Sequence, residues 1–480
     1  MAYASLREFL QALEEAGELI QVDEEVDWYL EVGAFARRMA DVSGGALLFT
    51  NVKDYGPGHR LFVNSVGTKR RFAIALGLPP ETTEAEVIEA FAQRIKRGMP
   101  PKEVATGPCK EHIRHGEAVD VLAFPAPHWN EKDGGRYIGT WNSIVFRDPD
   151  SDWVNVGLYR NVVHTRNEVG ILPLPAKHFV RVMKKYHDAG RAMPIAIAMG
   201  AEPILPIVAA TPFEYGVNEY DMAGALRQAP LEVVRCETSD LLVPATSEIV
   251  LEGHVNPGEL RDEGPFGEFT GYYGGARAPR PVVRIDCVTH RDDPILTGSF
   301  EGKPVVEDHL QGTVAYSALL KNRLDDLGLA VRGVYTDPWS LTFIVVVSLK
   351  PQFMGHTFQV ASAIWSCRLG VKVNWVITVD EDIDPTNLHE VWWAISTRCK
   401  GDRDIFIKGH DYGHPLHPCL TPEERKQGIG FKVHLDACWP ANWPRDDTWR
   451  PPVCDWHSFP EEVRARVLAK LERLRGGRGE

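Results

Sequence analysis

The sequence of 480 residues lacks a long apolar run and the usual nucleotide-binding signatures. No stretch reaches the roughly 20 apolar residues that cross a bilayer. The first residues show no charged segment followed by an apolar one, so neither a membrane protein nor a secreted one is expected. A G-x-G-x-x-G after a strand and a G-x4-G-K-[ST] are both missing, which excludes the common dinucleotide and P-loop folds.

An excess of positive charge and a cysteine framework are also missing. The net charge of −13 argues against a nucleic-acid partner. The eight cysteines are scattered without a C-x-x-C, which indicates reduced thiols in a cytoplasmic protein rather than disulfides or a zinc site. What is present, 44% hydrophobic and 25% charged residues, is typical of a globular protein with room for two to four domains.

A small α/β unit is predicted over residues 1–110. Ser5 with Glu8, and Thr83 with Glu86, have the spacing of a helix-starting capping box ahead of amphipathic runs. Short apolar stretches between the two helices read as strands. A cluster of prolines after the second helix marks the boundary of this unit.

The predicted secondary structure changes twice along the rest of the chain. Short strands with turn signals fill residues 111–304, including one expected at 154–163, and this density predicts an antiparallel or mixed barrel rather than a parallel sheet. A long helix, at 307–327, occupies the linker 305–330. Beyond it, residues 331–480 alternate β-branched runs with helical patterns, which predicts an α/β domain. The fold class is therefore a multidomain α+β and α/β chain.

Two carboxylates lie on a rigid segment near the end of the barrel region. Glu263 and Glu268 are separated by Gly-Pro-Phe-Gly, and glycine and proline fix turn geometry. One such carboxylate can stay charged beside a cation while the other, less solvated, holds and releases a proton near neutral pH. An isolated pair with this spacing is more often a solvated surface loop, so a cation and a cofactor have to come from elsewhere in the chain.

Several long segments, in the same order, resemble the UbiD family of decarboxylases over essentially the whole chain. The start of the chain, Met1-Ala2-Tyr3 followed by Ser5, also looks like hydroxybenzoate- or vanillate-type members. The segments that carry the family resemblance are residues 155–160, His178, and residues 218–227, 243–253, 263–273, 391–398 and 436–437.

The resemblance implies an enzyme that uses prenylated FMN, supplied by a partner flavin prenyltransferase. Members interconvert unsaturated or aromatic carboxylic acids with their decarboxylated products and carbon dioxide. The implied fold is a split β-barrel that binds the flavin, joined by a long helix to an α/β dimerisation domain. A homodimer is the family expectation, and a hexamer is the alternative.

The resemblance also implies a metal centre. Asn155, His178 and Glu219 would hold Mn²⁺, or Mg²⁺, against the cofactor phosphate, and mixed oxygen and nitrogen ligands suit such hard ions. No two of these residues are close in sequence, and each alone would more often be a structural hydrogen-bonder. A potassium ion is expected near Trp153 and residues 209–211, mainly through backbone carbonyls.

The catalytic roles follow from the same resemblance. Arg160 would pair with Glu263 and position the substrate carboxylate, while Glu268 would protonate the carbon that loses carbon dioxide from a covalent adduct with the cofactor. Arg368 would bind the cofactor phosphate. The cofactor-binding residues implied are Asn155, Leu158, Tyr159, Arg160, Lys177, His178, Glu219 and Arg368.

The substrate pocket is expected to be polar. Two lysines, an amide and an imidazole would favour an aromatic or heteroaromatic acid with a second polar group. Each has a simpler explanation: Lys372 can extend from a strand edge, and His410, like His414 and His417, can serve a turn or the surface. The aligned pocket positions are Lys177, Phe269, Lys372, Asn374 and His410.

Three alternatives remain open at this point. A cinnamate-like acrylic acid is the alternative substrate. A flavin-dependent oxidoreductase on the same barrel is the alternative enzyme, and a non-catalytic assembly or cofactor-carrier subunit is the alternative to any enzyme. The complete set of Arg160, Glu263 and Glu268 argues against the last two.

Overall fold

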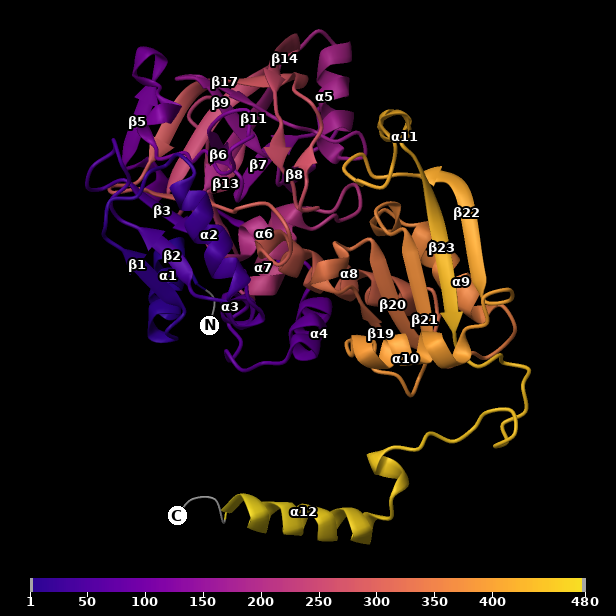
Figure 1. Ribbon diagram of the computed structural model, residues 1–480. Coiled ribbons are helices and arrows are strands. Elements are labelled where there is room, and N and C mark those ends of the chain that lie inside the picture. Colours follow the sequence, from indigo (N-terminus) through magenta and orange to yellow (C-terminus); the bar gives the residue numbers. More distant parts are fainter. Residues whose placement is uncertain (1–2, 477–480) are drawn as a thin grey trace.

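The computed structural model describes residues 3–476, with one group of elements on each side of a central helix (Figure 1). Met1 and Ala2, part of the family-like start, lie outside the described residues, as do residues 477–480 at the end of the predicted C-terminal domain. Within residues 3–476, no helix combines the length and the apolar character needed to span a bilayer.

Helices with the predicted start signals cover the N-terminal sheet. The Ser5 hydroxyl accepts a hydrogen bond from the Glu8 amide, which confirms the predicted cap, but the Glu8 carboxylate accepts from the Ala4 amide instead of that of Ser5. The reciprocal capping box at Thr83 and Glu86 is complete. The helices are α1 (Leu6–Glu15), α2 (Glu31–Asp41), α3 (Lys69–Ala75) and α4 (Glu84–Arg94).

The N-terminal sheet has four strands and takes one of them from much later in the chain. Parallel pairing of β18 with β3 brings the end of the predicted barrel segment into this sheet, so the two segments are interleaved. The order is β1 (Leu19–Val22), β2 (Ala46–Phe49), β3 (Arg60–Val63) and β18 (Ile295–Gly298). A smaller sheet contains β13 (Leu242–Pro244), β12 (Glu232–Arg235) and β4 (Lys102–Val104).

The middle of the chain forms a nine-stranded antiparallel sheet, as predicted for a barrel. The strand expected at 154–163 is two strands, because residues 158–160 leave the ladder between them. The strands are β5 (His112–His115), β6 (Tyr137–Gly139), β7 (Asn142–Arg147), β8 (Val154–Gly157), β9 (Asn161–Thr165), β10 (Glu168–Gly170), β11 (Met193–Met199), β14 (Ile249–Glu263) and β17 (Ala278–His290). Around them lie the hairpin of β15 (Phe266–Gly267) and β16 (Tyr273–Gly274), and helices α5 (His178–Asp188), α6 (Ile204–Ala210) and α7 (Glu219–Arg227).

The predicted long helix is present as α8 (Glu307–Asp326), and in Figure 1 it lies between the barrel and the C-terminal sheet. That five-stranded sheet is covered on both faces. Val345 and Val347 pack in the cluster that includes α8 and α9 residues, whereas Val346 packs with α10 residues. Its order is β19 (Val331–Tyr335), β20 (Ile344–Leu349), β21 (Trp375–Asp380), β23 (Ile429–Ala437) and β22 (Ile405–Tyr412). The helices of this C-terminal part of the chain are α9 (His356–Trp365), α10 (Leu388–Arg398), α11 (Pro422–Gln427) and α12 (Glu461–Gly476).

Candidate active site

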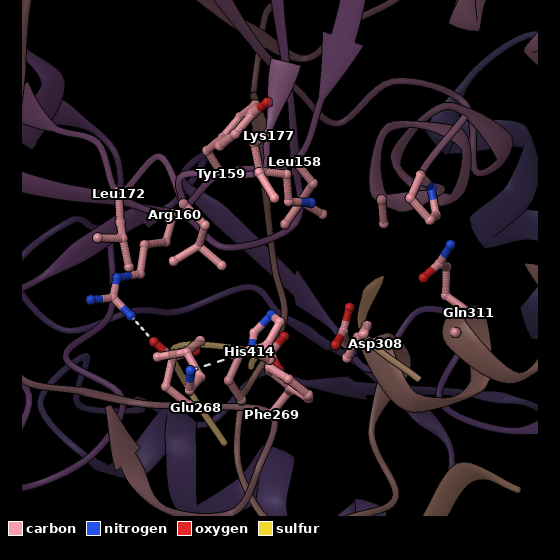
Figure 2. Close-up of a pocket in the computed structure, with 18 of the residues that line it drawn as sticks. Leu158, Tyr159, Arg160, Leu172, Lys177, Glu268, Phe269, Asp308, Gln311 and His414 are labelled. Carbon is pink, nitrogen blue, oxygen red and sulfur yellow. Dashed lines mark hydrogen bonds and ion pairs between the residues drawn. The ribbon is translucent and has the colours of Figure 1, made fainter. Parts of the chain in front are cut away.

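A cavity of about 410 Å³ is lined by residues of the barrel, of α8 and of the C-terminal domain. Figure 2 shows Arg160 and Glu268 on one side of it, with Asp308 and Gln311 of α8 on the other. The break between β8 and β9 matters here, because residues 158–160 line the cavity only by leaving the sheet. Sequence reasoning missed Asp308 and Gln311, which lie on a helix that we expected only to link domains.

Arg160 joins the two glutamates of the 263–273 segment. Its Nε and Nη2 donate to the two oxygens of Glu263 at 2.8 and 2.9 Å, and its Nη1 donates to Glu268 Oε1. Tyr137 donates its hydroxyl to Glu263 Oε1 at 3.0 Å. The guanidinium carbon also lies 4.8 Å from the centroid of the Phe266 ring. The Gly-Pro-Phe-Gly spacer thus supplies the ring that packs against the cation shared by both carboxylates.

The environments of this cluster favour different protonation states. Burial raises the pKa of Glu268 to about 7, with Arg160 opposing and Glu263 adding to the shift. Burial would lower the pKa of Arg160, but Glu268 and Glu263 together raise it, so the guanidinium stays charged. Glu263 has a two-point ion pair with that cation. The arrangement can therefore hold one fixed carboxylate and one exchangeable proton in the same cavity wall.

Asn155, His178 and Glu219 converge although they come from β8, the start of α5 and the start of α7. Asn155 Nδ2 lies 2.5 Å from Glu219 Oε1 and 3.3 Å from His178 Nδ1. All three side chains are buried. The Val156 amide donates to the second Glu219 oxygen at 3.0 Å. Convergence of one amide, one imidazole and one carboxylate is the donor set that the family resemblance implied for a divalent ion.

The chemistry of these three residues fits such an ion. His178 Nε2 is buried and has no hydrogen-bond partner within residues 3–476. Burial and the nearby Arg368 and Lys177 lower the pKa of His178 to about 3, which leaves the neutral imidazole that metals bind. Burial raises the pKa of Glu219 to about 8, because little positive charge compensates its carboxylate. A divalent ion would supply that charge.

Two cations near this trio also line the cavity, where they could bind an anionic cofactor group. Lys177 precedes His178 at the start of α5, and burial lowers the pKa of its ammonium to about 8. Arg368 lines the cavity, and its Nη1 lies 3.5 Å from the Ala176 carbonyl.

The Leu158 amide donates to the Ala209 carbonyl at 2.9 Å, so this backbone carbonyl of the expected potassium region already accepts one hydrogen bond.

Other groups of the expected potassium region also have protein partners. The Trp153 indole donates to the Val217 carbonyl at 2.7 Å. The Thr211 hydroxyl donates to the Ile207 carbonyl at 2.8 Å and accepts from Gln311 Nε2 at 2.9 Å. The bond from Gln311 to Thr211 ties the end of α6 to α8. The potassium ion stays a prediction.

Three of the five residues expected in the substrate pocket line the cavity, namely Lys177, Phe269 and Lys372. The Lys372 ammonium lies 3.9 Å from the centroid of the Phe269 ring, a cation–π contact. Burial lowers the pKa of Lys372 to about 8. An apolar platform and a cation therefore lie together where a planar polar substrate can be held.

Asn374 and His410, which we expected in the pocket wall, lie elsewhere among the described residues. Asn374 is 1% exposed and donates its side-chain amide to the Phe431 carbonyl at 2.9 Å, within the sheet. His410 is exposed on β22, where a bulge between Lys408 and Asp411 turns it to solvent. His414 takes the place expected for His410: it lines the cavity, and its ring centroid lies 5.8 Å from that of Phe269.

Burial and the nearby Lys372 and Lys177 hold the pKa of His414 well below its usual range, so the cavity has a neutral imidazole. We had expected His414 to serve a turn or the surface. The only signal for it is its position four residues after His410 in a glycine-containing loop. Which of the two histidines reaches the cavity depends on where β22 ends and on the path of the loop after it.

Comparison with known proteins assigns the chain to a family. Family models for the N-terminal domain, the Rift-related domain and the C-terminal domain of 3-octaprenyl-4-hydroxybenzoate carboxy-lyase match residues 10–91, 102–304 and 309–437. The chain belongs to the UbiD family. It has the three-domain UbiD fold and is a decarboxylase (carboxy-lyase) of that class.

Two curated relatives of this UbiD-family chain match over nearly their whole length. It is 32% identical to pyrrole-2-carboxylic acid decarboxylase of Pseudomonas aeruginosa, over 96% of each chain. It is 36% identical to phenolic acid decarboxylase of Bacillus subtilis, over 92% of this chain and 93% of that one.

Two solved structures agree with that placement. Vanillic acid decarboxylase of Sedimentibacter hydroxybenzoicus, in its closed form, is 32% identical, with a TM-score of 0.90 over 99% of each chain. An evolved dimeric form of the UbiD-class enzyme HmfF from Pelotomaculum thermopropionicum, in complex with prenylated FMN, is 31% identical, with a TM-score of 0.78 over 96% of this chain and 100% of that one.

Proposed function

We propose that this UbiD-family chain reversibly decarboxylates a polar aromatic or heteroaromatic carboxylic acid, without net oxidation, with Glu268 as the proton donor. The observation that carries the proposal is the contact of one guanidinium with two carboxyl groups in different environments. Loss of carbon dioxide from a carboxylate leaves a carbanion equivalent that must take up one proton. Glu268, with a pKa of about 7 in the cavity wall, can hold that proton at neutral pH.

Arg160 and Glu263 have supporting roles in this scheme. Arg160, fixed by Glu263, presents positive charge toward the cavity and would orient the substrate carboxylate. Prenylated FMN, when bound, supplies the electron sink for the charge left by carbon dioxide. Glu268 then transfers its proton to that carbon and regains one from solvent, which balances the single proton consumed per turnover. Proton donation of this kind contributes on the order of 10²–10⁴-fold in rate.

The cofactor phosphate would be held by three kinds of group. Asn155, His178 and Glu219 would bind Mn²⁺, or Mg²⁺, and Lys177 and Arg368 would add direct positive charge. The buried, unpartnered Nε2 of His178, judged over the described part of the chain, supports the metal assignment. A flavin prenyltransferase would supply the cofactor, and K⁺ is assigned to the Trp153 region on family resemblance.

The polar cavity supports the substrate class. Lys372, Lys177 and His414 offer donors beside the Phe269 ring, and an acid with a hydroxyl group or ring heteroatom could use them. The names of the two curated relatives, a phenolic acid and a pyrrole-2-carboxylic acid decarboxylase, agree with such a substrate. An unsubstituted acrylic acid would leave these buried polar groups unpaired, which makes it the second candidate.

A homodimer through the C-terminal domain is the assembly that we propose. The edge strand β22 presents Ile405, Phe406 and Ile407, which are 42%, 39% and 69% exposed. An exposed apolar edge strand is a surface that another strand or chain covers. Replacing Ile407 with lysine should shift the sedimentation of the protein toward the monomer; unchanged sedimentation would place the interface elsewhere and leave a hexamer built on other surfaces to be tested.

The function is tested by expressing the chain together with a flavin prenyltransferase and screening phenolic, pyrrole and cinnamate-type acids for carbon dioxide release and for exchange of the ring proton in D₂O. Glu268→Gln should bind the cofactor and lose turnover. Glu259→Gln is the matched control, because Glu259 pairs with Arg284 and does not line the cavity, within the described residues. Full activity of Glu268→Gln contradicts the mechanism, and oxidation of NADH by the holoenzyme would favour the oxidoreductase alternative.

A further inference from the structure

Lys432 is a buried lysine whose ammonium group contacts only backbone carbonyls among the described residues. It lies on β23 and is 1% exposed. Its ammonium donates three hydrogen bonds, to the carbonyls of Gly370, Val371 and Val373 at 2.9, 3.1 and 2.7 Å. All three donors of the ammonium are thus used on one short turn.

That turn carries two of the cations of the candidate site. Arg368 begins it and Lys372 ends it, and both line the cavity. Two of the three bonds from Lys432 go to the residues on either side of Lys372. The backbone that presents Lys372 is therefore held from within the protein, by a buried residue that is not among those lining the cavity.

The turn is also fixed by close packing and by its downstream neighbour. A Cβ atom at Gly370 would lie 1.8 Å from the Ile364 carbonyl oxygen, so the turn contacts the end of α9 directly. Asn374 anchors the chain just after the turn. Its backbone amide donates to the Phe343 carbonyl at 2.8 Å, and its side-chain amide donates to the Phe431 carbonyl. Asn374, expected in the pocket, belongs to this support instead.

We propose that Lys432 is a positioning residue, which holds this turn so that Arg368 meets the cofactor phosphate. The proposal rests on the function proposed above. Without the ammonium, three buried carbonyls would lack donors, which is unfavourable, so the turn would shift toward water to satisfy them. Arg368 would shift with it, while the barrel residues that line the cavity, such as Leu158 and Tyr159, would stay in place.

The charged groups near Lys432 are Asp411 and Lys408, and Lys408 provides a matched control. Lys408 is the cross-strand neighbour of Lys432 on β22. Its side chain is 56% exposed and pairs with Asp411 at 2.7 Å. Lys408→Met removes one lysine charge from the same pair of strands without touching the turn.

The test measures binding of FMN and of riboflavin by flavin fluorescence, with Mn²⁺ and K⁺ present, because only FMN carries the phosphate. Lys432→Met should weaken FMN binding about tenfold or more and leave riboflavin binding unchanged, while Lys408→Met should change neither. Arg368→Met should show the same loss for FMN. The double variant should be no weaker than Arg368→Met alone, since Lys432 acts through Arg368.

Each other outcome is decisive. Equal loss of FMN and riboflavin binding by Lys432→Met would overturn the positioning role, and so would additive losses of FMN binding in the double variant. It would also be overturned if Lys432→Met bound FMN as the wild type does while Arg368→Met bound it weakly. Wild-type binding by Arg368→Met overturns both this inference and the phosphate role of Arg368, while the activity of Glu268→Gln tests the decarboxylase function separately. If Lys432→Met does not fold by thermal melting, Lys432→Gln, which keeps two donors, replaces it with the same criteria.

Discussion

The Arg160 guanidinium contacts both carboxylate oxygens of Glu263, through parallel hydrogen bonds of 2.8 and 2.9 Å. Its third nitrogen is left for Glu268. This two-point pairing fixes the plane of the guanidinium, which a single bond would leave free to rotate. The direction in which positive charge faces the cavity is therefore determined by Glu263.

Replacing Arg160 with lysine tests the importance of that plane. An ammonium keeps the charge but cannot reproduce the two-point pair with Glu263. With saturating prenylated FMN, we expect kcat/KM to fall on the order of 10²-fold, or about 3 kcal/mol of transition-state stabilisation. Steady-state kinetics with a phenolic acid measures this. A loss below threefold would show that charge alone is sufficient.

The pH dependence follows from Glu268. Its pKa is raised to about 7, so it holds its proton below that pH and loses it above. As a proton donor it should give a kcat/KM that is highest on the acidic side and falls about tenfold per unit above pH 7. Lys372, whose pKa is about 8, titrates higher. The same descending limb should thus persist in Lys372→Met; its disappearance there would assign the limb to the lysine.

Removal of the metal should act on the cofactor before it acts on the fold. The trio of Asn155, His178 and Glu219 would bind an ion whose charge also serves the phosphate, so chelation by EDTA should weaken FMN binding at least about tenfold. His178→Ala should bind FMN as weakly as the chelated wild type and should not respond to EDTA. Titration of FMN with and without Mn²⁺ measures both. A wild-type protein that ignores EDTA contradicts the metal assignment.

Lys372 should determine which acids are used. Its ammonium beside the Phe269 ring can reach a polar substituent, and loss of a charged hydrogen bond costs about 1.5–3 kcal/mol, or roughly 10–100-fold. Lys372→Met should reduce kcat/KM by that factor for a hydroxylated aromatic acid. For an unsubstituted cinnamate-type acid the variant should equal or exceed the wild type. Equal losses for both acids would assign Lys372 to the cofactor rather than to the substrate.

Local sequence was a good guide to elements whose cause is local. The capping box at Thr83 and the 20-residue helix α8 follow from spacing and apolar periodicity, and the structure has both. The break at residues 158–160 was missed because Val154–Gly157 and the β-branched residues of β9 favour strand on both sides. The Arg160 side chain is held there by Glu263, a contact that no local rule contains.

The substrate side shows the same division. Phe269 follows Glu268 directly, so its place in the cavity goes with that of the 263–273 segment. His410 lies on β22 and His414 in the loop after it; the bulge in β22 turns His410 to solvent, while His414 contacts Phe269. Asn374 carries a polar side chain suited to a pocket, but the neighbouring strand uses it as a backbone partner.

The sequence by itself determined the family, the order of the domains and the residue types available for chemistry, because long motifs keep their order along the chain. It also determined that Glu263 and Glu268 share one rigid segment. Only the tertiary structure decided which atoms meet: Arg160 reaches both glutamates, the distant Asn155, His178 and Glu219 converge, and Lys432 donates to the carbonyls of the turn. These contacts join residues 23 to 108 positions apart, and their geometry depends on how distant strands and helices pack rather than on local propensity.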